Sequence, residues 1–354
     1  MTSHWPPWKA PDGWGPSLTA NRTLAILTGL TLLLAPACAK PQSTPAAAPP
    51  CPPQNERYCA AATGDLLDVR LADLKPTQPS LGYDEVYYRL GRYTLGPDPR
   101  RELLDAWCAT NGQTGLKSAG TDASITEPAS FDCTIPVGSE TPESTTAMKT
   151  GVIGPGGQVY LTDGHHTLTS FWEAPGGGPE TRIRLKVTGN MSTLAVGDFW
   201  PQMRDRGWTW LQDVNGKPVD PQQLPDSLGL KKFANDPYRG VLYFVRDVGY
   251  AQEDTSPAFQ EFYWGQWLRA QSDPSLQPAN FTLTELPSYL ILVGNIGKAL
   301  VALPGDTVVA NSRTADELGK LKEFGEKPFD ALSQPVDSPK PGKLALAVTY
   351  KKAH

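Results

Sequence analysis

Apolar residues recur along this 354-residue chain in short stretches with either strand or helix spacing. Period-two alternation and bordering turn residues predict strands over 68–74, 150–153, 158–161, 181–188, 208–211 and 340–351. Spacing at every third or fourth residue predicts helices over 83–90, 100–107, 165–174, 194–207, 237–248 and 259–269. The helix over 194–207 is expected to break early, at Pro201. The second and third strands flank a Gly-Pro-Gly-Gly turn and should form a hairpin.

The stretch 156–172 carries the strongest pattern for a functional site. It predicts a short strand, a tight turn at Asp163 and Gly164, and then the start of a helix at His165 and His166. A helix N-terminus has unpaired backbone N–H groups and partial positive charge, so it favours a phosphate-like or carboxylate-like anion. The alternative is purely structural: the turn is only a turn, capped by a side chain of Thr162 or Asp163, with one histidine pointing inward.

The composition indicates a folded body with unstructured ends. The chain has 33 Gly and 35 Pro, which favour turns over long helices, while 32 Trp, Tyr and Phe residues can fill a core. Its net charge is −5, and it has no basic run longer than a pair of residues. Binding of duplex nucleic acid by the whole surface is therefore excluded, but a local positive cleft is not.

The N-terminal part predicts export. Residues 24–34 form an uncharged apolar run that is too short to span a bilayer but suits the core of an export signal. We expect residues 1–38 to be an export or lipoprotein-type signal and the Pro- and Ala-rich residues 39–58 to be a linker. Cys38 is the predicted lipid-attachment residue, and ordinary cleavage after Ala37 is the alternative. The protein is accordingly expected on a membrane by a lipid anchor, or free in the periplasm or outside the cell.

Cysteine usage agrees with an oxidising compartment. If Cys38 carries lipid, four cysteines remain and can form two disulfides: Cys51, Cys59, Cys108 and Cys133. Four cysteines allow three pairings, and the sequence does not choose among them. Ordinary signal cleavage would leave Cys38 as an odd thiol.

Three blocks of the chain resemble the ParB/sulfiredoxin superfamily, and within it the ParB-like nucleases. They are Val-Arg-Leu-Ala-Asp-Leu-Lys-Pro-Thr-Gln-Pro at 69–79 with Gly-Tyr-Asp-Glu-Val at 82–86, Thr-Asp-Gly-His-His-Thr at 162–167 within 152–172, and Asp-Pro-Tyr-Arg-Gly at 236–240 with 259–269. The blocks follow the family order across about 200 residues. The resemblance implies an α/β (α+β) fold, with a small mixed sheet surrounded by helices, over 59–270. Residues 271–354 would be a C-terminal extension of unclear fold.

The resemblance also implies a phosphate-binding element. The matching positions are Gly164, His165, His166 and Thr167, and the ligand would be a nucleotide phosphate or a phosphodiester in nucleic acid. Many relatives have Arg where this chain has Thr167. The cysteine that serves the superfamily's reductases is missing from the turn, and no helix-turn-helix region is recognisable, so reductase chemistry and chromosome partitioning are not expected.

Phosphodiester hydrolysis is the leading hypothesis for the chemistry. His165 and His166 are the candidates for general base and charge stabiliser, and Asp163 would orient one of them or hold Mg²⁺ or Mn²⁺. Motif position adds weaker candidates, whose other interpretation is as surface residues: Gln78, Glu85, Arg239 and Glu261. Two other hypotheses remain open. One is a noncatalytic, envelope-associated binding protein with a ParB-like fold, and the other is a nucleotide-dependent small-molecule kinase if the chain is cytoplasmic.

Overall fold

The computed structural model describes residues 49–253 and 256–354. The predicted signal over 1–38, its Cys38 and the first ten residues of the linker lie outside the described residues. All described residues belong to one compact unit, whose fold is given below. None of its described helices combines the length and the apolar character that crossing a membrane requires.

A mixed five-stranded sheet lies at the centre of the fold, with the strand order β1-β8-β6-β7-β2. Its strands are β1 (Leu66–Arg70), β2 (Leu74–Lys75), β6 (Thr150–Ile153), β7 (Val159–Leu161) and β8 (Arg182–Asn190). The pairs β1–β8 and β6–β7 are antiparallel, and β6–β8 and β2–β7 are parallel. Side chains of β8 alternate between buried and half-buried, as expected for a strand with one face on the core.

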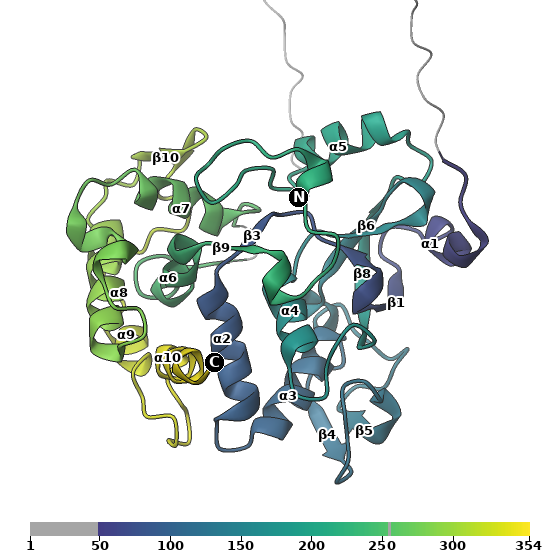
Figure 1. Ribbon diagram of the computed structural model, residues 1–354, viewed down its shortest axis with the longest axis horizontal. Coiled ribbons are helices and arrows are strands. Elements are labelled where there is room, and N and C mark those ends of the chain that lie inside the picture. The colour runs from purple at the N-terminus through teal and green to yellow at the C-terminus, as the bar shows by residue number, and fades with distance from the viewer. Residues whose placement is uncertain (1–48, 254–255) are drawn as a thin grey trace, which may run out of the picture. The chain divides into compact units, whose positions relative to one another are not determined.

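Besides this sheet, the described chain contains ten helices and three two-stranded sheets, joined by loops and short 3-10 turns (Figure 1). The helices are α1 (Glu56–Cys59), α2 (Tyr83–Thr94), α3 (Pro99–Thr110), α4 (His165–Glu173), α5 (Val196–Asp205), α6 (Pro237–Val245), α7 (Gln260–Arg269), α8 (Leu286–Val301), α9 (Glu326–Ala331) and α10 (Lys343–Ala353). The small sheets pair β3 (Ser80–Leu81) with β9 (Ala234–Asn235), β4 (Leu116–Ala119) with β5 (Phe131–Cys133), and β10 (Val308–Ala310) with β11 (Arg313–Thr314).

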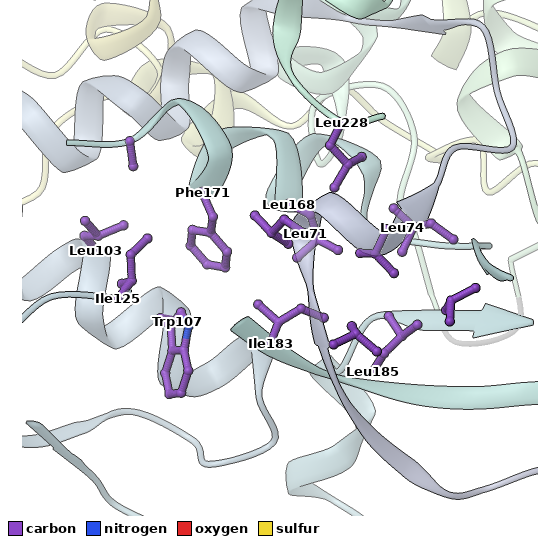
Figure 2. Close-up of a cluster of buried hydrophobic side chains, with 14 of the residues drawn as sticks. Leu71, Leu74, Leu103, Trp107, Ile125, Leu168, Phe171, Ile183, Leu185 and Leu228 are labelled. Carbon is purple, nitrogen blue, oxygen red and sulfur yellow. The ribbon is translucent and has the colours of Figure 1, made fainter. Parts of the chain in front are cut away.

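The first hydrophobic core packs helices α2, α3 and α4 against the sheet. Figure 2 shows Leu168 and Phe171 of α4 facing the β8 residues Ile183 and Leu185, with Trp107 of α3 beside them. All five side chains are buried. Burying a side chain of this size contributes roughly 1.5–3 kcal/mol, so this core fixes the position of α4 and of the turn that precedes it.

A second core joins the C-terminal residues to the helices that precede them. Leu292 and Ile296 of α8 and Leu344 of α10 are completely buried in it with Phe244 of α6 and Trp264 of α7. Helix α10 also packs along α2 (Figure 1). Residues after 270 therefore share a core with the helices α6 and α7.

Two disulfides link the four described cysteines, Cys51 with Cys59 and Cys108 with Cys133. The first joins the segment before α1 to the end of that helix. The second joins α3 to β5 and closes the stretch between them, which is rich in Gly, Ser and Thr. Of the three pairings that the sequence allows, the structure thus contains the one between neighbours along the chain.

Most of the predicted elements are confirmed, including the hairpin, which is β6 and β7. The strand predicted over 68–74 is divided by a 3-10 turn at Leu71–Asp73 into β1 and β2. The break predicted at Pro201 is wrong, because α5 continues through this proline. The helix loses one backbone hydrogen bond there, while Phe199 and Met203 on either side are fully buried.

The two remaining strand predictions are wrong. Residues 340–351 lie mostly in α10, because Leu344, Ala347 and Val348 recur at helical spacing and are buried against α2 and the second core. Residues 208–211 form no strand, although the backbone N–H of Trp210 donates to Thr77 O at 2.9 Å and Leu211 O accepts from Val219 N–H at 3.0 Å. Single bonds to two different segments do not make a ladder.

Candidate functional site

A cleft of about 410 Å³ lies where the turn before α4 meets helices α2, α6 and α7. Its lining contains four basic and three acidic side chains: Arg89, Lys149, Arg239, Arg246, Glu85, Asp163 and Glu261. The sequence of the whole chain is acidic, but the cleft has a small excess of positive charge. All seven of the predicted catalytic and weaker candidate residues line it, and so do Gly164 and Thr167.

Helix α4 begins without a side-chain cap. Its N-cap is Gly164, with φ 97° and ψ 12°, and no side chain accepts from the first turn. Neither residue proposed as a cap takes that part, since Thr162 Oγ1 lies 2.8 Å from Thr150 Oγ1 and Asp163 pairs with Lys149 at 3.6 Å. A side chain at position 164 would be strained by this φ, and its Cβ would lie 2.5 Å from Lys149 Cγ.

Three backbone amides at this helix start have no partner within the described part of the chain. The first amide of α4 that donates a hydrogen bond is Leu168 N, to Gly164 O at 2.8 Å. Those of His165, His166 and Thr167 donate to no described group. Their residues line the cleft, so the cleft combines free N–H donors with the positive end of the helix dipole, an arrangement that can hold an anion.

His165 is buried and neutral. Its Nε2 accepts a hydrogen bond from the Thr77 backbone N–H at 3.1 Å, which places the proton on Nδ1. Burial lowers the pKa of His165 to about 3, with Arg239 adding to the effect and Asp163 opposing it. This hydrogen bond connects the start of α4 to Thr77, in the segment after β2.

His166 is held in the same way by a different element. Its Nε2 accepts from Gly82 N–H at 3.1 Å, and its Nδ1 lies 3.1 Å from Glu85 Oε2. Burial lowers the pKa of His166 well below its usual value, and the nearby Arg239 acts in the same direction. Neutral His166 therefore donates from Nδ1 to Glu85. As with His165, the lone pair that a general base would use already accepts a backbone N–H.

Glu85 is held by α2 as well as by His166. Arg89, one turn further along this helix, donates to Glu85 Oε1 at 2.7 Å. Both carboxylate oxygens of Glu85 thus have partners, and its side chain is only 7% exposed. This carboxylate links α2 to the start of α4, and the surface interpretation of Glu85 is wrong.

Arg239 is a buried cation with an incomplete set of partners. Its Nη1 donates to Ser80 O at 2.9 Å, its Nη2 lies 4.0 Å from Glu261 Oε2, and its guanidinium carbon lies 3.6 Å from the Phe262 ring centroid. The Nε atom is buried and has no hydrogen-bond partner among the described residues. Burial lowers the pKa of Arg239, although the neighbouring carboxylates, with Glu261 first, oppose this shift. The surface interpretation is wrong for Arg239 too.

The remaining candidates lie around this centre. Gln78 is buried and donates from Nε2 to Ser80 O at 3.0 Å, and Glu261 forms an ion pair with Arg246. Asp163 differs from both, since 63% of its side chain is exposed. Across the described ranges, no three His, Cys, Asp or Glu side chains gather closely enough to hold a metal ion. Asp163, paired with Lys149, does not fit the carboxylate cluster of an all-protein Mg²⁺ or Mn²⁺ site.

Sequence reasoning missed several groups that shape the cleft. Arg89 lies four residues after Glu85, a spacing at which an ion pair on one helix could have been foreseen. Lys149, Arg246 and Phe259 carry no comparable signal. They reach the cleft only because segments about 100 residues apart fold together.

Comparisons with known proteins place these observations in a family. The family model described as "Putative ParB-like nuclease" matches residues 67–270. Among solved structures, the chain is similar to the crystal structure of protein Atu1540 from Agrobacterium tumefaciens, at 19% identity and a TM-score of 0.46, covering 69% of this chain and 97% of that one. No curated protein matches the sequence.

Proposed function

The chain belongs to the family of ParB-like nucleases, and we propose that its cleft binds the phosphate group of a phosphodiester or nucleotide. The observation that carries this proposal is the set of three free backbone amides at His165, His166 and Thr167. Backbone N–H groups at a helix start bind phosphate without needing a charged side chain. The replacement of the Arg common in relatives by Thr167 is compatible with such a site.

Basic side chains around the amides support the same ligand. Lys149 lies against Gly164, and the buried Arg239 and the half-buried Arg246 line the cleft. Among the described residues, these two arginines share one close carboxylate partner, Glu261. In a buried site the field of these groups is screened less than in water. An anion there would balance the excess of positive charge on the side chains that line the cleft.

In this proposal the two histidines position the binding site and do not transfer protons. Both are neutral, and both use Nε2 to accept a backbone N–H, from Thr77 and from Gly82. They join the start of α4 to two separate segments, and so hold the three amides in place. The Nδ1–H groups of the two rings differ in their partners, because that of His166 donates a hydrogen bond to Glu85.

Hydrolysis of a phosphodiester is the second candidate function, favoured by the exposed Asp163 and by the description of the family. Asp163 is the cleft carboxylate that has the fewest partners, and it lies next to the free amides. It is thus the group best placed to accept a proton from water, while Lys149 and the amides stabilise negative charge on the phosphate oxygens. No step of this scheme requires a metal ion held by the protein.

Export is proposed together with this function. Two disulfides between the four described cysteines are compatible with an oxidising compartment. A lipid anchor at Cys38 would hold the domain at a membrane, while cleavage after Ala37 would release it. The proposal of phosphate binding also includes an envelope-associated domain that binds a phosphate group without hydrolysing it.

Binding is tested by calorimetry with inorganic phosphate and a dinucleotide, on the chain from Cys38 onward. Lys149→Met should weaken the affinity for both ligands about tenfold, because it removes a charge next to the amides. Lys117→Met, on the exposed strand β4, is the matched control and should leave the affinity unchanged. Wild-type protein that binds neither ligand would overturn the proposal.

Hydrolysis is tested on single- and double-stranded DNA and on RNA, with Mg²⁺, Mn²⁺ or EDTA. Cleavage that disappears in Asp163→Asn but persists in Lys117→Met would support the catalytic function. The EDTA arm decides whether a metal ion takes part. A His165→Ala, His166→Ala variant should lose phosphate binding along with any cleavage. The same background cleavage in all variants would leave binding as the function.

A further inference from the structure

A second cavity, of about 650 Å³, adjoins the phosphate cleft. The two cavities share Gly207 and Phe259 in their linings. Away from this border the second cavity is lined by aromatic and polar side chains, among them Trp210, Tyr263 and Gln212. A ligand that enters the charged cleft can therefore extend into a space of quite different chemistry.

The aromatic side chains of this cavity form one packed group with Phe262, which lines the phosphate cleft. The Trp210 ring lies 5.5 Å from that of Phe259, 5.6 Å from that of Tyr263 and 4.4 Å from that of Phe262, measured between centroids. Trp210 and Phe262 are buried, while Phe259 and Tyr263 are half-buried and carry the exposed ring surface. Phe262 also lies under the Arg239 guanidinium, so this group extends to the phosphate cleft.

Phe259 keeps an unfavourable backbone conformation at the border between the cavities. Its φ is 62° and its ψ is 26°, the left-handed region that a bulky side chain rarely occupies. It is the N-cap residue of α7, and no side chain caps that helix. Strained residues of this kind gather at binding sites, where the surrounding structure holds them in place. Here the strain places an aromatic ring where the two cavities meet.

We infer that the second cavity receives the planar base of the nucleotide whose phosphate binds at the start of α4. This inference rests on the proposed function. A base has a π-face that can stack on the half-buried rings of Phe259 and Tyr263, and such stacking tolerates different bases. Its polar edge would meet side chains such as Gln212 and Asn311 at the rim. The occupant is either a free nucleotide or one residue of a single strand, since a base paired in a duplex cannot present both faces.

The same pair of cavities does not suit a ligand with phosphate alone. The aromatic space would then remain empty beside an occupied cleft. A protein partner also fits poorly, because the surface is concave and continues into a charged cleft. The combination of phosphate and a planar ring accounts for both cavities with one ligand.

The test compares ligands that share a phosphate but differ in the base. Affinities of the chain from Cys38 onward are measured for ribose 5-phosphate, adenosine 5′-monophosphate and a six-nucleotide single-stranded DNA. We expect the two ligands with bases to bind at least tenfold more tightly than ribose 5-phosphate. Adenosine monophosphate represents the free nucleotide and the DNA represents the strand, so the tighter of the two identifies the source.

Two variants separate the base site from the phosphate site. Tyr263→Leu removes a half-buried ring, and Val219→Trp fills the rim of the second cavity without removing a ring from the packed group. Each should reduce binding of adenosine monophosphate to the level of ribose 5-phosphate and leave the affinity for ribose 5-phosphate unchanged. Tyr350→Leu, on α10 and outside both linings, is the matched control, and should keep the preference for the base.

The outcomes distinguish this inference from the function on which it rests. If ribose 5-phosphate and adenosine monophosphate bind equally to the wild-type protein, the base site is refuted and phosphate binding stands. If neither binds, the phosphate site fails and the base site fails with it. If both cavity variants keep the wild-type preference, the base lies elsewhere and the assignment of the second cavity is wrong.

Discussion

Replacing His165 by Gln tests the neutral, buried state of this imidazole. The oxygen of a Gln side chain can accept from the Thr77 N–H as Nε2 does, but Gln has no proton to gain in acid. In the wild-type protein, burial lowers the pKa of His165 from 6.5 to about 3. The folded protein therefore disfavours protonation of this ring, while the unfolded chain accepts a proton readily.

The consequence is a stability that depends on pH. A base with a depressed pKa in the folded state contributes its full stability above the unfolded pKa, and this contribution is lost as the pH falls. At pH 5, some 1.5 units below the pKa of His165 in the unfolded chain, protonation of this residue stabilises the unfolded chain. The free energy of unfolding is therefore lower by about 2 kcal/mol. The loss continues towards pH 3, where it reaches roughly 4 kcal/mol because the folded protein is itself half protonated at that pH.

The assay is urea unfolding at pH 7.5 and pH 5 for the wild type and His165→Gln. We expect the wild type to lose about 2 kcal/mol more than the variant between the two pH values. Carboxylates and His166 titrate in both proteins, so they cancel in this difference. His354→Gln, at the exposed C-terminus, should behave like the wild type. Equal losses in the wild type and His165→Gln would refute the buried, neutral histidine.

Three further predictions concern the turn, the disulfides and the C-terminal helices. Gly164→Ala and Gly64→Ala share a φ of +97°, so the backbone strain should lower the stability of each variant by about 1–2 kcal/mol. The contact of the new Cβ with Lys149 adds to this loss in Gly164→Ala. Only Gly164→Ala should also weaken phosphate binding in calorimetry, because nothing lies within 4 Å of the added Cβ at Gly64; equal binding by the two would contradict this. Removing Cys108–Cys133, which spans 25 residues, should lower the free energy of unfolding by about 3.5 kcal/mol, against about 2.5 kcal/mol for Cys51–Cys59, which spans 8. Urea unfolding of the two double Ser variants measures this order, and the reverse order would count against it. A chain ending at residue 270 should lack cooperative thermal unfolding, because it loses Leu292, Ile296 and Leu344 from the second core; a transition as sharp as that of the whole chain would show that the core does not need them.

The local parts of the fold could be predicted from the sequence. The β6–β7 hairpin, α4 and α6 each carry their own signals, such as a Gly-rich turn, the Asp-Gly turn and a proline in the first helical turn. Helix α10 could not be predicted, because the larger apolar residues Leu344, Leu346 and Val348 alternate as they would in a strand. Its conformation depends on packing against α2, which is more than 240 residues away in the sequence.

The candidate site shows the same limit. Gln78, Glu85, Arg239 and Glu261 could be selected by motif position, and they do line one cleft with the Asp163 turn. The sequence does not predict the charge state of each group or its hydrogen-bond partners. Burial makes the imidazoles neutral, and only the folded structure determines which nitrogen accepts a backbone N–H. Residue types alone therefore favour proton transfer, whereas the burial and the hydrogen bonds of the two rings support the positioning role that we propose.

The arrangement of the histidine pair explains how two imidazoles can support the proposed phosphate site without acting as acid or base. His165 connects the start of α4 to Thr77, and His166 connects it to Gly82 and Glu85. Both connections require a lone pair on Nε2, which only a neutral ring has. Protonation would break the two bonds and place positive charge beside Arg239. The geometry of the free amides is thus coupled to the charge state of the rings, and burial keeps those rings neutral.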